Sequence, residues 1–183
     1  MEERDRVKRI KRELVQKGTI LDIYKDTMLL PNGKTEEWDF VSHRKGAAAV
    51  VPVTEDGKIL MVKQYRNALE RMTLEIPAGA RDSVTEDTKV CAARDLEEET
   101  GYRSEDLSFL ISLKTTVAFC DEFIDVYLAK NLKPGKQHLD EGEFIDVEAY
   151  EIEELCQRIY AGEIQDAKTV AALLAYKNLL NEQ

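Results

Sequence analysis

Residues 94–101 read Arg94-Asp95-Leu96-Glu97-Glu98-Glu99-Thr100-Gly101. We expect them to end a helix over residues 85–100, because a glycine after the last turn readily adopts the left-handed conformation that closes a helix. At about 100° per residue, Glu98 lies about 60° around the helix axis from Asp95, and Glu99 lies about 40° to the other side. Asp95, Glu98 and Glu99 therefore share one face, and Glu97 points away from it.

Three carboxylates this close together repel one another, which raises their pKa values unless a cation lies among them. Oxygen ligands of this kind suit Mg²⁺ or Mn²⁺. Arg94 lies one turn before Glu98, so an ion pair can fix the rotamer of that carboxylate. The alternative is a solvated acidic helix with ordinary ion pairs between successive turns, and the preceding sequence bears on the choice.

Residues 75–79 read Glu75-Ile76-Pro77-Ala78-Gly79 and predict a short strand followed by a tight turn. Ser83 and Glu86 have the spacing of a capping box, which marks the start of a helix. The order is Gly79, six residues, Glu86, seven residues and then residues 94–102. In this order the chain resembles the Nudix hydrolase family, whose box reads G-x5-E-x7-R-E-U-x-E-E-x-G-U, with U aliphatic or aromatic.

Two positions depart from the family box. The loop between Gly79 and Glu86 is one residue longer, which changes the turn but not the spacing within the helix. Asp95 stands where the box has glutamate, and its side chain is one methylene shorter. We expect Asp95 to bind a metal through water or more weakly than a glutamate would.

Further segments resemble the ADP-ribose pyrophosphatase branch of the family, from about residue 15 to residue 180. They are residues 75–79, Lys63-Gln64-Tyr65-Arg66 and Leu30-Pro31-Asn32-Gly33. The resemblance implies that Asp95, Glu98 and Glu99 bind Mg²⁺, with Mn²⁺ as a possible substitute, and that the carbonyl of Ala78 assists them. It also implies that Arg66 binds a phosphate or the terminal ribose; the alternative is an ordinary surface arginine at a strand end.

A second acidic group, Asp140-Glu141-Gly142-Glu143, lies in a loop before a strand. Similar enzymes carry a D-E-x-E segment here, in which one glutamate helps to bind metal and another deprotonates the attacking water. We assign Glu141 as the general base and Glu143 as the metal ligand, with the reverse assignment open. A purely solvated acidic loop is the alternative.

The resemblance implies a reaction in which a metal-activated water attacks a phosphorus of a pyrophosphate, with Glu141 and Arg94 as the catalytic residues. ADP-ribose would give AMP and ribose 5-phosphate. Residues 116–119 read Thr116-Val117-Ala118-Phe119, without the proline of the Ser-Pro-Gly-Phe segment found in many ADP-ribose enzymes. Phe119 is a candidate substrate contact. GDP-mannose, another sugar nucleotide, or a weakly active nucleotide-sugar-binding sensor therefore remain alternatives.

The N-terminal part is expected to be separate from the catalytic part. Residues 19–41 alternate around an Asn-Gly turn and predict a β-hairpin. Tyr24 and Trp38 in this hairpin are candidates for stacking on adenine, with ordinary packing as the alternative. Residues 1–16 form a mostly basic arm, expected as a solvated helix, a frayed tail or an arm on a partner subunit. In the branch that the chain resembles, the N-terminal sheet usually crosses to a second subunit, so the resemblance implies a homodimer. An isolated hairpin is only marginally stable in water, which gives it a physical reason to seek a partner surface.

The rest of the chain predicts an α/β sandwich of mixed sheet and helices, with the hairpin as an N-terminal appendage. The resemblance implies that this is the Nudix-type α/β/α sandwich. We divide the chain into an expected dimerisation element, residues 1–45, and a hydrolase domain, residues 46–183. The expected elements are strands over residues 47–53, 58–64, 74–76, 107–116, 122–128 and 144–150, and final helices over residues 152–161 and 165–180.

Composition narrows the class further. The 183 residues include 26 Lys and Arg and 36 Asp and Glu, a net charge of −10, so general nucleic-acid binding is not expected. No apolar run approaches the roughly 18 residues of a membrane span, and the charged N-terminus does not resemble a signal peptide. Three widely spaced cysteines, Cys91, Cys120 and Cys156, indicate reduced thiols in a cytoplasmic protein.

Overall fold

The computed structural model describes residues 6–139 and 141–182. Its elements group into two compact units, residues 1–45 with 114–122 and residues 46–113 with 123–183. Residues 114–122 group with the N-terminal unit, whereas the sequence division placed them in the hydrolase domain. Within the described part, no helix is both long and apolar enough to cross a lipid bilayer.

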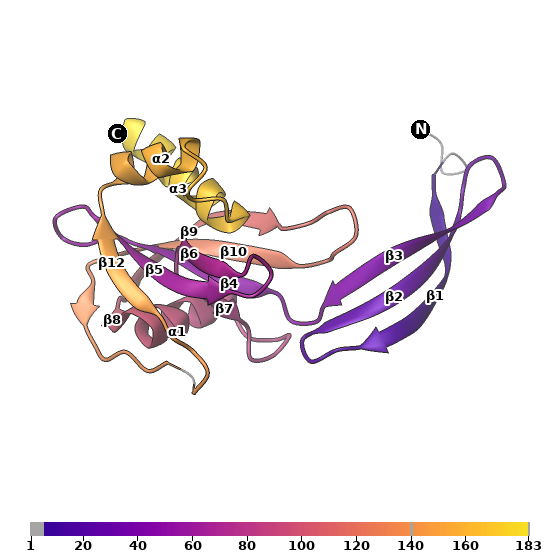
Figure 1. Cartoon of the computed structure of the whole chain (residues 1–183), viewed down its shortest axis with the longest axis horizontal. Helices are drawn as coiled ribbons and strands as arrows, with labels where there is room; N and C mark the ends of the chain where they lie inside the picture. The colour runs from indigo at the N-terminus through magenta and orange to yellow at the C-terminus, as the bar shows by residue number, and fades with distance from the viewer. Residues whose placement is uncertain (1–5, 140, 183) are drawn as a thin grey trace. The chain divides into compact units, whose positions relative to one another are not determined.

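The first unit is an antiparallel sheet in the order β1-β2-β3 (Figure 1). Its strands are β1 (Lys8–Lys17), β2 (Leu21–Leu29) and β3 (Thr35–His43). The expected hairpin is confirmed as β2 and β3, and Gly33 in the turn between them has a φ of 80°. The basic arm was expected as a solvated helix, a frayed tail or an arm on a partner subunit; most of its described part is the strand β1, so the expected helix was wrong. The reason is that β1 pairs along most of its length with β2.

The second unit contains the remaining strands and the three helices of the described residues. The strands are β4 (Ala47–Pro52), β5 (Ile59–Arg66), β6 (Arg71–Glu75), β7 (Ala78–Ala80), β8 (Tyr102–Arg103), β9 (Asp106–Lys114), β10 (Phe123–Lys130), β11 (Lys133–Pro134) and β12 (Asp146–Tyr150). The helices are α1 (Thr88–Thr100), α2 (Ile152–Tyr160) and α3 (Ala167–Asn181). The strands form sheets in the orders β7-β4-β10-β9, β12-β5-β6 and β11-β8, with β4 and β10 parallel.

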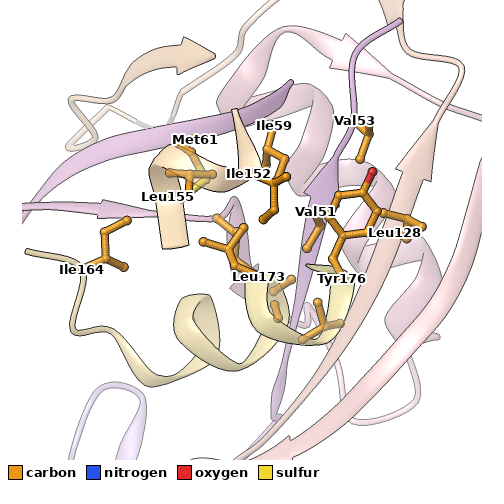
Figure 2. Packing of buried hydrophobic residues seen from close by; sticks show 14 of the residues in the cluster. Val51, Val53, Ile59, Met61, Leu128, Ile152, Leu155, Ile164, Leu173 and Tyr176 are labelled. Atoms are coloured by element: carbon orange, nitrogen blue, oxygen red, sulfur yellow. The ribbon is translucent and has the colours of Figure 1, made fainter. Parts of the chain in front are cut away.

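The two faces of β4 show how the layers are built. Ala48 and Val50 pack in one apolar cluster with Leu96 of α1. Val51, on the opposite face, packs in a second cluster with Leu173 of α3 (Figure 2). Because successive strand residues point to opposite faces, a strand buried on both sides reads as a continuous apolar run. The expected α/β/α sandwich is confirmed.

Candidate functional site

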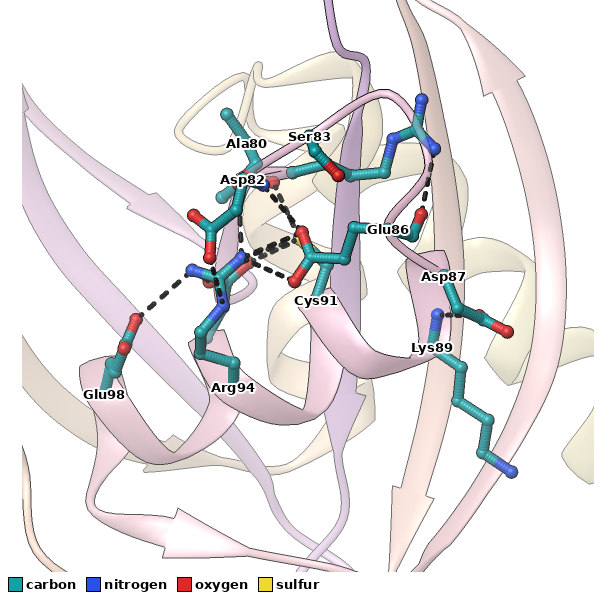
Figure 3. Close-up of polar contacts among 12 residues, drawn as sticks. Ala80, Asp82, Ser83, Glu86, Asp87, Lys89, Cys91, Arg94 and Glu98 are labelled. Atoms are coloured by element: carbon teal, nitrogen blue, oxygen red, sulfur yellow. Dashed lines mark hydrogen bonds and ion pairs between the residues drawn. The ribbon is translucent and has the colours of Figure 1, made fainter.

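The loop from β7 to α1 sets the position of the carboxylate helix (Figure 3). The helix begins at Thr88, where the carboxylate of Asp87 caps it by accepting from the amide of Lys89 at 2.8 Å. The expected start at residue 85 and the capping box of Ser83 and Glu86 were therefore wrong. Glu86 instead accepts from the amide of Asp82 at 2.6 Å, so it closes the preceding loop.

The helix ends as predicted, at Gly101. This residue has a φ of 72°, and its amide donates to the carbonyl of Glu97 at 2.9 Å. A left-handed residue at this point stops the helix and satisfies one of its last carbonyls. The carboxylates of the last turn are thus held on a helix with a defined end.

Arg94 lies at the centre of an acidic group. Its guanidinium is 3.6 Å from the carboxylate of Glu98, which confirms the predicted ion pair. It is also 3.2 Å from Asp95 and 3.3 Å from Glu86. Figure 3 shows the guanidinium between the loop and the helix. Arg94 therefore orients Glu86 of the loop as well as Asp95 and Glu98 of the helix. The sequence predicted only its ion pair with Glu98.

Asp95 and Glu99 are the buried carboxylates of the shared face. They are 4% and 7% exposed, whereas the side chain of Glu98 is 43% exposed and lies nearer the protein surface. Burial raises the pKa of Asp95 to about 6, and the nearby charges of Glu98 and Glu86 add to this effect. Burial and the charge of Asp95 raise the pKa of Glu99 to about 8. Two buried carboxylates whose pKa values are both raised by burial suit a bound cation.

Gly79 lies directly against Asp95. A Cβ at position 79 would be 2.7 Å from Oδ2 of Asp95, closer than side chains pack. Cys91 donates its thiol hydrogen to the same Oδ2 at 3.3 Å, and burial raises the pKa of this thiol to about 12. The amide of Ala78 donates to Glu99 at 3.3 Å. The sequence indicated the glycine and Ala78 but not the contact of Cys91.

The second acidic loop is anchored to the end of α1. The side-chain amide of Gln137 donates to the carbonyl of Glu99 at 2.7 Å and to that of Ile145 at 3.4 Å. Glu141 and Glu143 are exposed, and the charge of Glu143 raises the pKa of Glu99. The structure therefore brings Glu143 within electrostatic reach of the helix. Asp140 lies outside the described residues.

A pocket of about 340 Å³ lies beside this loop, lined by Gln64, Tyr65, Arg66, Gly142, Glu143, Phe144 and Ile145. Arg66 ends β5, and its guanidinium donates to both carboxylate oxygens of Glu75, at 2.7 and 2.6 Å. Glu75 is 2% exposed, and it also accepts from Lys168. The sequence predicted neither Glu75 nor Lys168 as part of a site.

The three aromatic candidates belong to the first unit. Tyr24 lies 5.9 Å from Phe40 between ring centroids, and Arg12 lies over both rings. Trp38 is 45% exposed, and its indole donates to Glu36 at 3.3 Å. Phe119 is half exposed. Packing with Phe40 occupies one side of Tyr24, and Trp38 and Phe119 keep much of their rings exposed.

The carboxylates do not form a closed metal cage by themselves. Among residues 6–139 and 141–182, no three His, Cys, Asp and Glu side chains are grouped closely enough to hold an ion. The donor set nevertheless fits a hard divalent cation, because such cations prefer carboxylate oxygens and two of these carboxylates, Asp95 and Glu99, are buried. Asp95 and Glu99 provide buried oxygens, and Glu98 and Glu143 provide oxygens nearer the surface.

Comparison with known proteins shows which family the chain resembles. The family model described as NUDIX domain matches residues 43–173. The methanol dehydrogenase activator of Bacillus methanolicus is 44% identical over 168 residues, which cover 91% of this chain and 90% of that protein. The ADP-ribose pyrophosphatase of Bacillus subtilis (strain 168) is 40% identical over 180 residues, 96% of each protein. The crystal structure of an ADP compounds hydrolase shows the same fold, with a TM-score of 0.87 at 21% identity over 97% of this chain and 95% of that one.

Proposed function

Because this chain belongs to the NUDIX family, we propose that it is a divalent-metal-dependent hydrolase of nucleoside diphosphate sugars that converts ADP-ribose to AMP and ribose 5-phosphate. The observation that carries the proposal is the pair of buried carboxylates, Asp95 and Glu99, on the helix of the family box. ADP-ribose is favoured because relatives named ADP-ribose pyrophosphatase, from Bacillus subtilis and Mycobacterium tuberculosis, are 40% and 34% identical to this chain.

We assign the metal to Asp95, Glu98, Glu99 and Glu143, with the carbonyl of Ala78, and expect Mg²⁺ with Mn²⁺ as a substitute. The contact between Gly79 and Asp95 supports this, because it places the short aspartate against the backbone next to Ala78. When bound, a divalent cation neutralises the phosphate oxygens and lowers the pKa of the attacking water. Arg94 keeps Glu98 and Asp95 oriented for this ligand set.

Glu141 is our candidate for the general base, and Glu143 for the ligand, with the exchange of these roles as the alternative. The effect of Glu143 on the pKa of Glu99 supports its place beside the metal. A general base must accept the proton of the attacking water and give it up again at each turnover. The exposure of Glu141 suits that role, because its carboxylate oxygens are accessible to water.

Substrate contacts are assigned to Arg66, Tyr24, Trp38 and Phe119. Arg66 has a guanidinium suited to the pyrophosphate or the terminal ribose phosphate, and it lines the pocket next to Glu143. The half-exposed rings of Trp38 and Phe119 suit stacking on a base. The free thiols of Cys91, Cys120 and Cys156 support the proposed cytoplasmic location, where thiols stay reduced.

A second candidate function follows from the relative named methanol dehydrogenase activator, which is 44% identical to this chain. A protein of this fold would then act on a dehydrogenase as well as on a small molecule. Adding the chain to methanol dehydrogenase and measuring alcohol oxidation tests this, with the Glu98→Gln variant as the comparison. Equal stimulation by both proteins would indicate activation without hydrolysis.

The substrate is tested by incubating the protein and Mg²⁺ with ADP-ribose, GDP-mannose, ADP-glucose and UDP-glucose and comparing kcat/KM. We expect the highest value for ADP-ribose. A higher value for GDP-mannose would assign the protein to the other substrate class. Binding of ADP-ribose without hydrolysis of any compound would favour the sensor.

The homodimer is the third part of the proposal. In the described part of the first unit, the buried side chains are Asp22 and Asp26, and no apolar side chain is buried. Ile10, Leu14 and Val15 of β1 are each more than half exposed. A sheet without an apolar core is marginal alone, so a second copy of the chain would stabilise it.

We therefore expect light scattering to give about twice the monomer mass of 20.9 kDa. The double substitution Ile10→Glu and Leu14→Glu should shift the protein toward the monomer, because charges would then enter the interface. The substitution Val90→Glu, at an exposed apolar position of α1, is the control and should leave the mass unchanged. A monomeric wild-type protein at micromolar concentration would contradict the proposal.

The raised pKa of Glu99 predicts how pH affects the metal-free protein. Its pKa of about 8 in the folded chain lies above the ordinary value of 4.5, so its stabilising contribution is complete below pH 4.5 and is lost as pH rises toward 8. Each such group changes the free energy of unfolding by up to about 1.4 kcal/mol per pH unit within this range.

The Tm in EDTA should therefore fall between pH 5 and pH 8, and the fall should be smaller for Glu99→Gln. Mg²⁺ should raise the Tm of the wild type more at pH 8 than at pH 5, because the metal replaces the protons. Calorimetry of both proteins at the two pH values measures these effects. The same pH dependence in both proteins would contradict the prediction.

A further inference from the structure

The side chain of Arg66 is held in a fixed orientation by a buried carboxylate of the second unit, that of Glu75. Arg66 lies on β5, and its side chain runs back along the sheet to Glu75 of β6, because the residue opposite Glu75 is Val62. Thr73, two residue pairs closer to Arg66 along the two strands, donates its hydroxyl to Oε1 of Glu75 at 2.7 Å. The carboxylate that receives Arg66 is therefore itself fixed by a neighbour on the same strand.

Lys168 provides a second cation for the same carboxylate. It lies in the first turn of α3, its side chain is 9% exposed, and its ammonium contacts both Glu75 and Asp166. A lysine at a helix N-terminus is electrostatically unfavourable, and burying an ammonium is costly without an anion. Glu75 and Asp166 supply the anions. An apolar side chain would fill this position without either penalty, so packing alone does not explain a lysine.

The pairing leaves part of Arg66 available. A guanidinium has five N–H groups, and the two contacts to Glu75 use Nε and Nη2. Within residues 6–139 and 141–182, Nη1 of Arg66 donates no hydrogen bond. The Arg66 side chain is 41% exposed, while that of Glu75 is 2% exposed. Arg66 lines both the 340 Å³ pocket beside Glu143 and a 320 Å³ pocket formed with Leu69, Glu75 and Asp166.

We propose that Glu75 and Lys168 are positioning residues that hold the guanidinium of Arg66 with its remaining N–H groups directed to the phosphates of the substrate. This rests on the proposed function, because ADP-ribose supplies the phosphates. Glu75 fixes the plane of the guanidinium through two hydrogen bonds, which a single contact could not do. When Arg66 binds a phosphate and its positive charge is partly neutralised, Lys168 still provides a cation for the carboxylate of Glu75.

The test is a pair of double-mutant cycles. One combines Arg66→Ala with Glu75→Gln, and the other combines Arg66→Ala with Lys168→Met. Each protein is assayed for KM and kcat with ADP-ribose and Mg²⁺, and for its Kd with ADP-ribose in EDTA. We expect Glu75→Gln and Lys168→Met to raise KM and Kd about tenfold with little change in kcat, as the loss of uniform binding does. In the Arg66→Ala background both changes should have almost no further effect on KM or Kd.

Lys177→Met is the matched control, because Lys177 also lies on α3 and also pairs with a carboxylate, that of Glu153. It should leave KM and Kd unchanged. Thermal melting separates a loss of stability from a loss of binding in each variant. Effects of Glu75→Gln that multiply with those of Arg66→Ala would overturn the proposal, because a purely structural role would persist without the arginine.

The two proposals fail in different ways. Binding of ADP-ribose without turnover would contradict the proposed hydrolysis, and the Kd values would still test the role of Glu75 and Lys168. Turnover with multiplicative effects would contradict only the positioning role. If the wild type neither binds nor hydrolyses ADP-ribose, both proposals are wrong.

Discussion

Replacement of Glu98 by glutamine should reduce the turnover of ADP-ribose by about two to three orders of magnitude while the fold stays intact. Glutamine keeps the size of the side chain but removes the negative charge that we assign to the metal. The fold should tolerate the change, because the Glu98 side chain is 43% exposed and its ion pair with Arg94 is 3.6 Å long. Partly exposed substitutions of this kind usually change stability by about 0.5 kcal/mol or less.

The control is Glu97→Gln, at the next residue on the helix. The carboxylate of Glu97 faces the loop at Gly135, where a Cβ would lie 2.9 Å from it, and so it lies off the shared face. Its variant should keep turnover within about threefold of the wild type. Steady-state kinetics and the Mg²⁺ concentration for half-maximal rate compare the two proteins. If Glu98→Gln turned over ADP-ribose at close to the wild-type rate, the assignment of Glu98 as a metal ligand would be wrong.

Substitution of Gly79 by alanine should also have a large effect. The added Cβ would lie 2.7 Å from Oδ2 and 2.9 Å from Cγ of Asp95, so either the carboxylate or the strand β7 must move. Overpacking of this kind destabilises by about 1–3 kcal/mol. Because Asp95 is a proposed ligand, we also expect the apparent metal affinity to fall at least about tenfold.

Gly57→Ala separates these two effects. Gly57 has a φ of 85° in a turn, and a Cβ there would meet no atom within 4 Å. Alanine at this position should therefore lower the Tm through backbone strain and leave the metal requirement unchanged. Calorimetry and Mg²⁺ titrations of activity measure both quantities. An unchanged metal requirement in Gly79→Ala would argue against Asp95 as a ligand.

Local patterns were enough to predict most of the second unit. Residues 47–53 form a continuous apolar run, and this run is the buried strand β4 with both faces covered. The spacing of Asp95, Glu98 and Glu99 predicted their shared face, because it depends only on the geometry of one helix. Gly101 closes that helix for a reason that is also local.

The wrong predictions concern features that depend on neighbours. Ser83 and Glu86 have capping-box spacing, but Asp87 is the cap, since its carboxylate reaches the first turn and Glu86 is bound to the loop. The basic arm carries no regular apolar alternation, and it becomes β1 through its pairing with β2. Such pairing cannot be read from the arm itself.

The support of Arg66 was not predictable for the same reason. Glu75 and Lys168 are separated by 93 positions, and only the packing of α3 against the sheet brings them together. The sequence gives Glu75 as one residue of a short strand and Lys168 as one of many surface-type lysines. In the folded chain these two residues are only 2% and 8% exposed, which neither local sequence indicates.

The most direct test of the proposed chemistry is hydrolysis of ADP-ribose in H₂¹⁸O, with Mg²⁺ or with EDTA, followed by mass spectrometry of the products. We expect AMP and ribose 5-phosphate in equal amounts, with one ¹⁸O in one of the two phosphates, in the presence of Mg²⁺ only. Cleavage that persists in EDTA, products other than these two, or intact ADP-ribose after prolonged incubation with Mg²⁺ would contradict metal-dependent hydrolysis of the pyrophosphate.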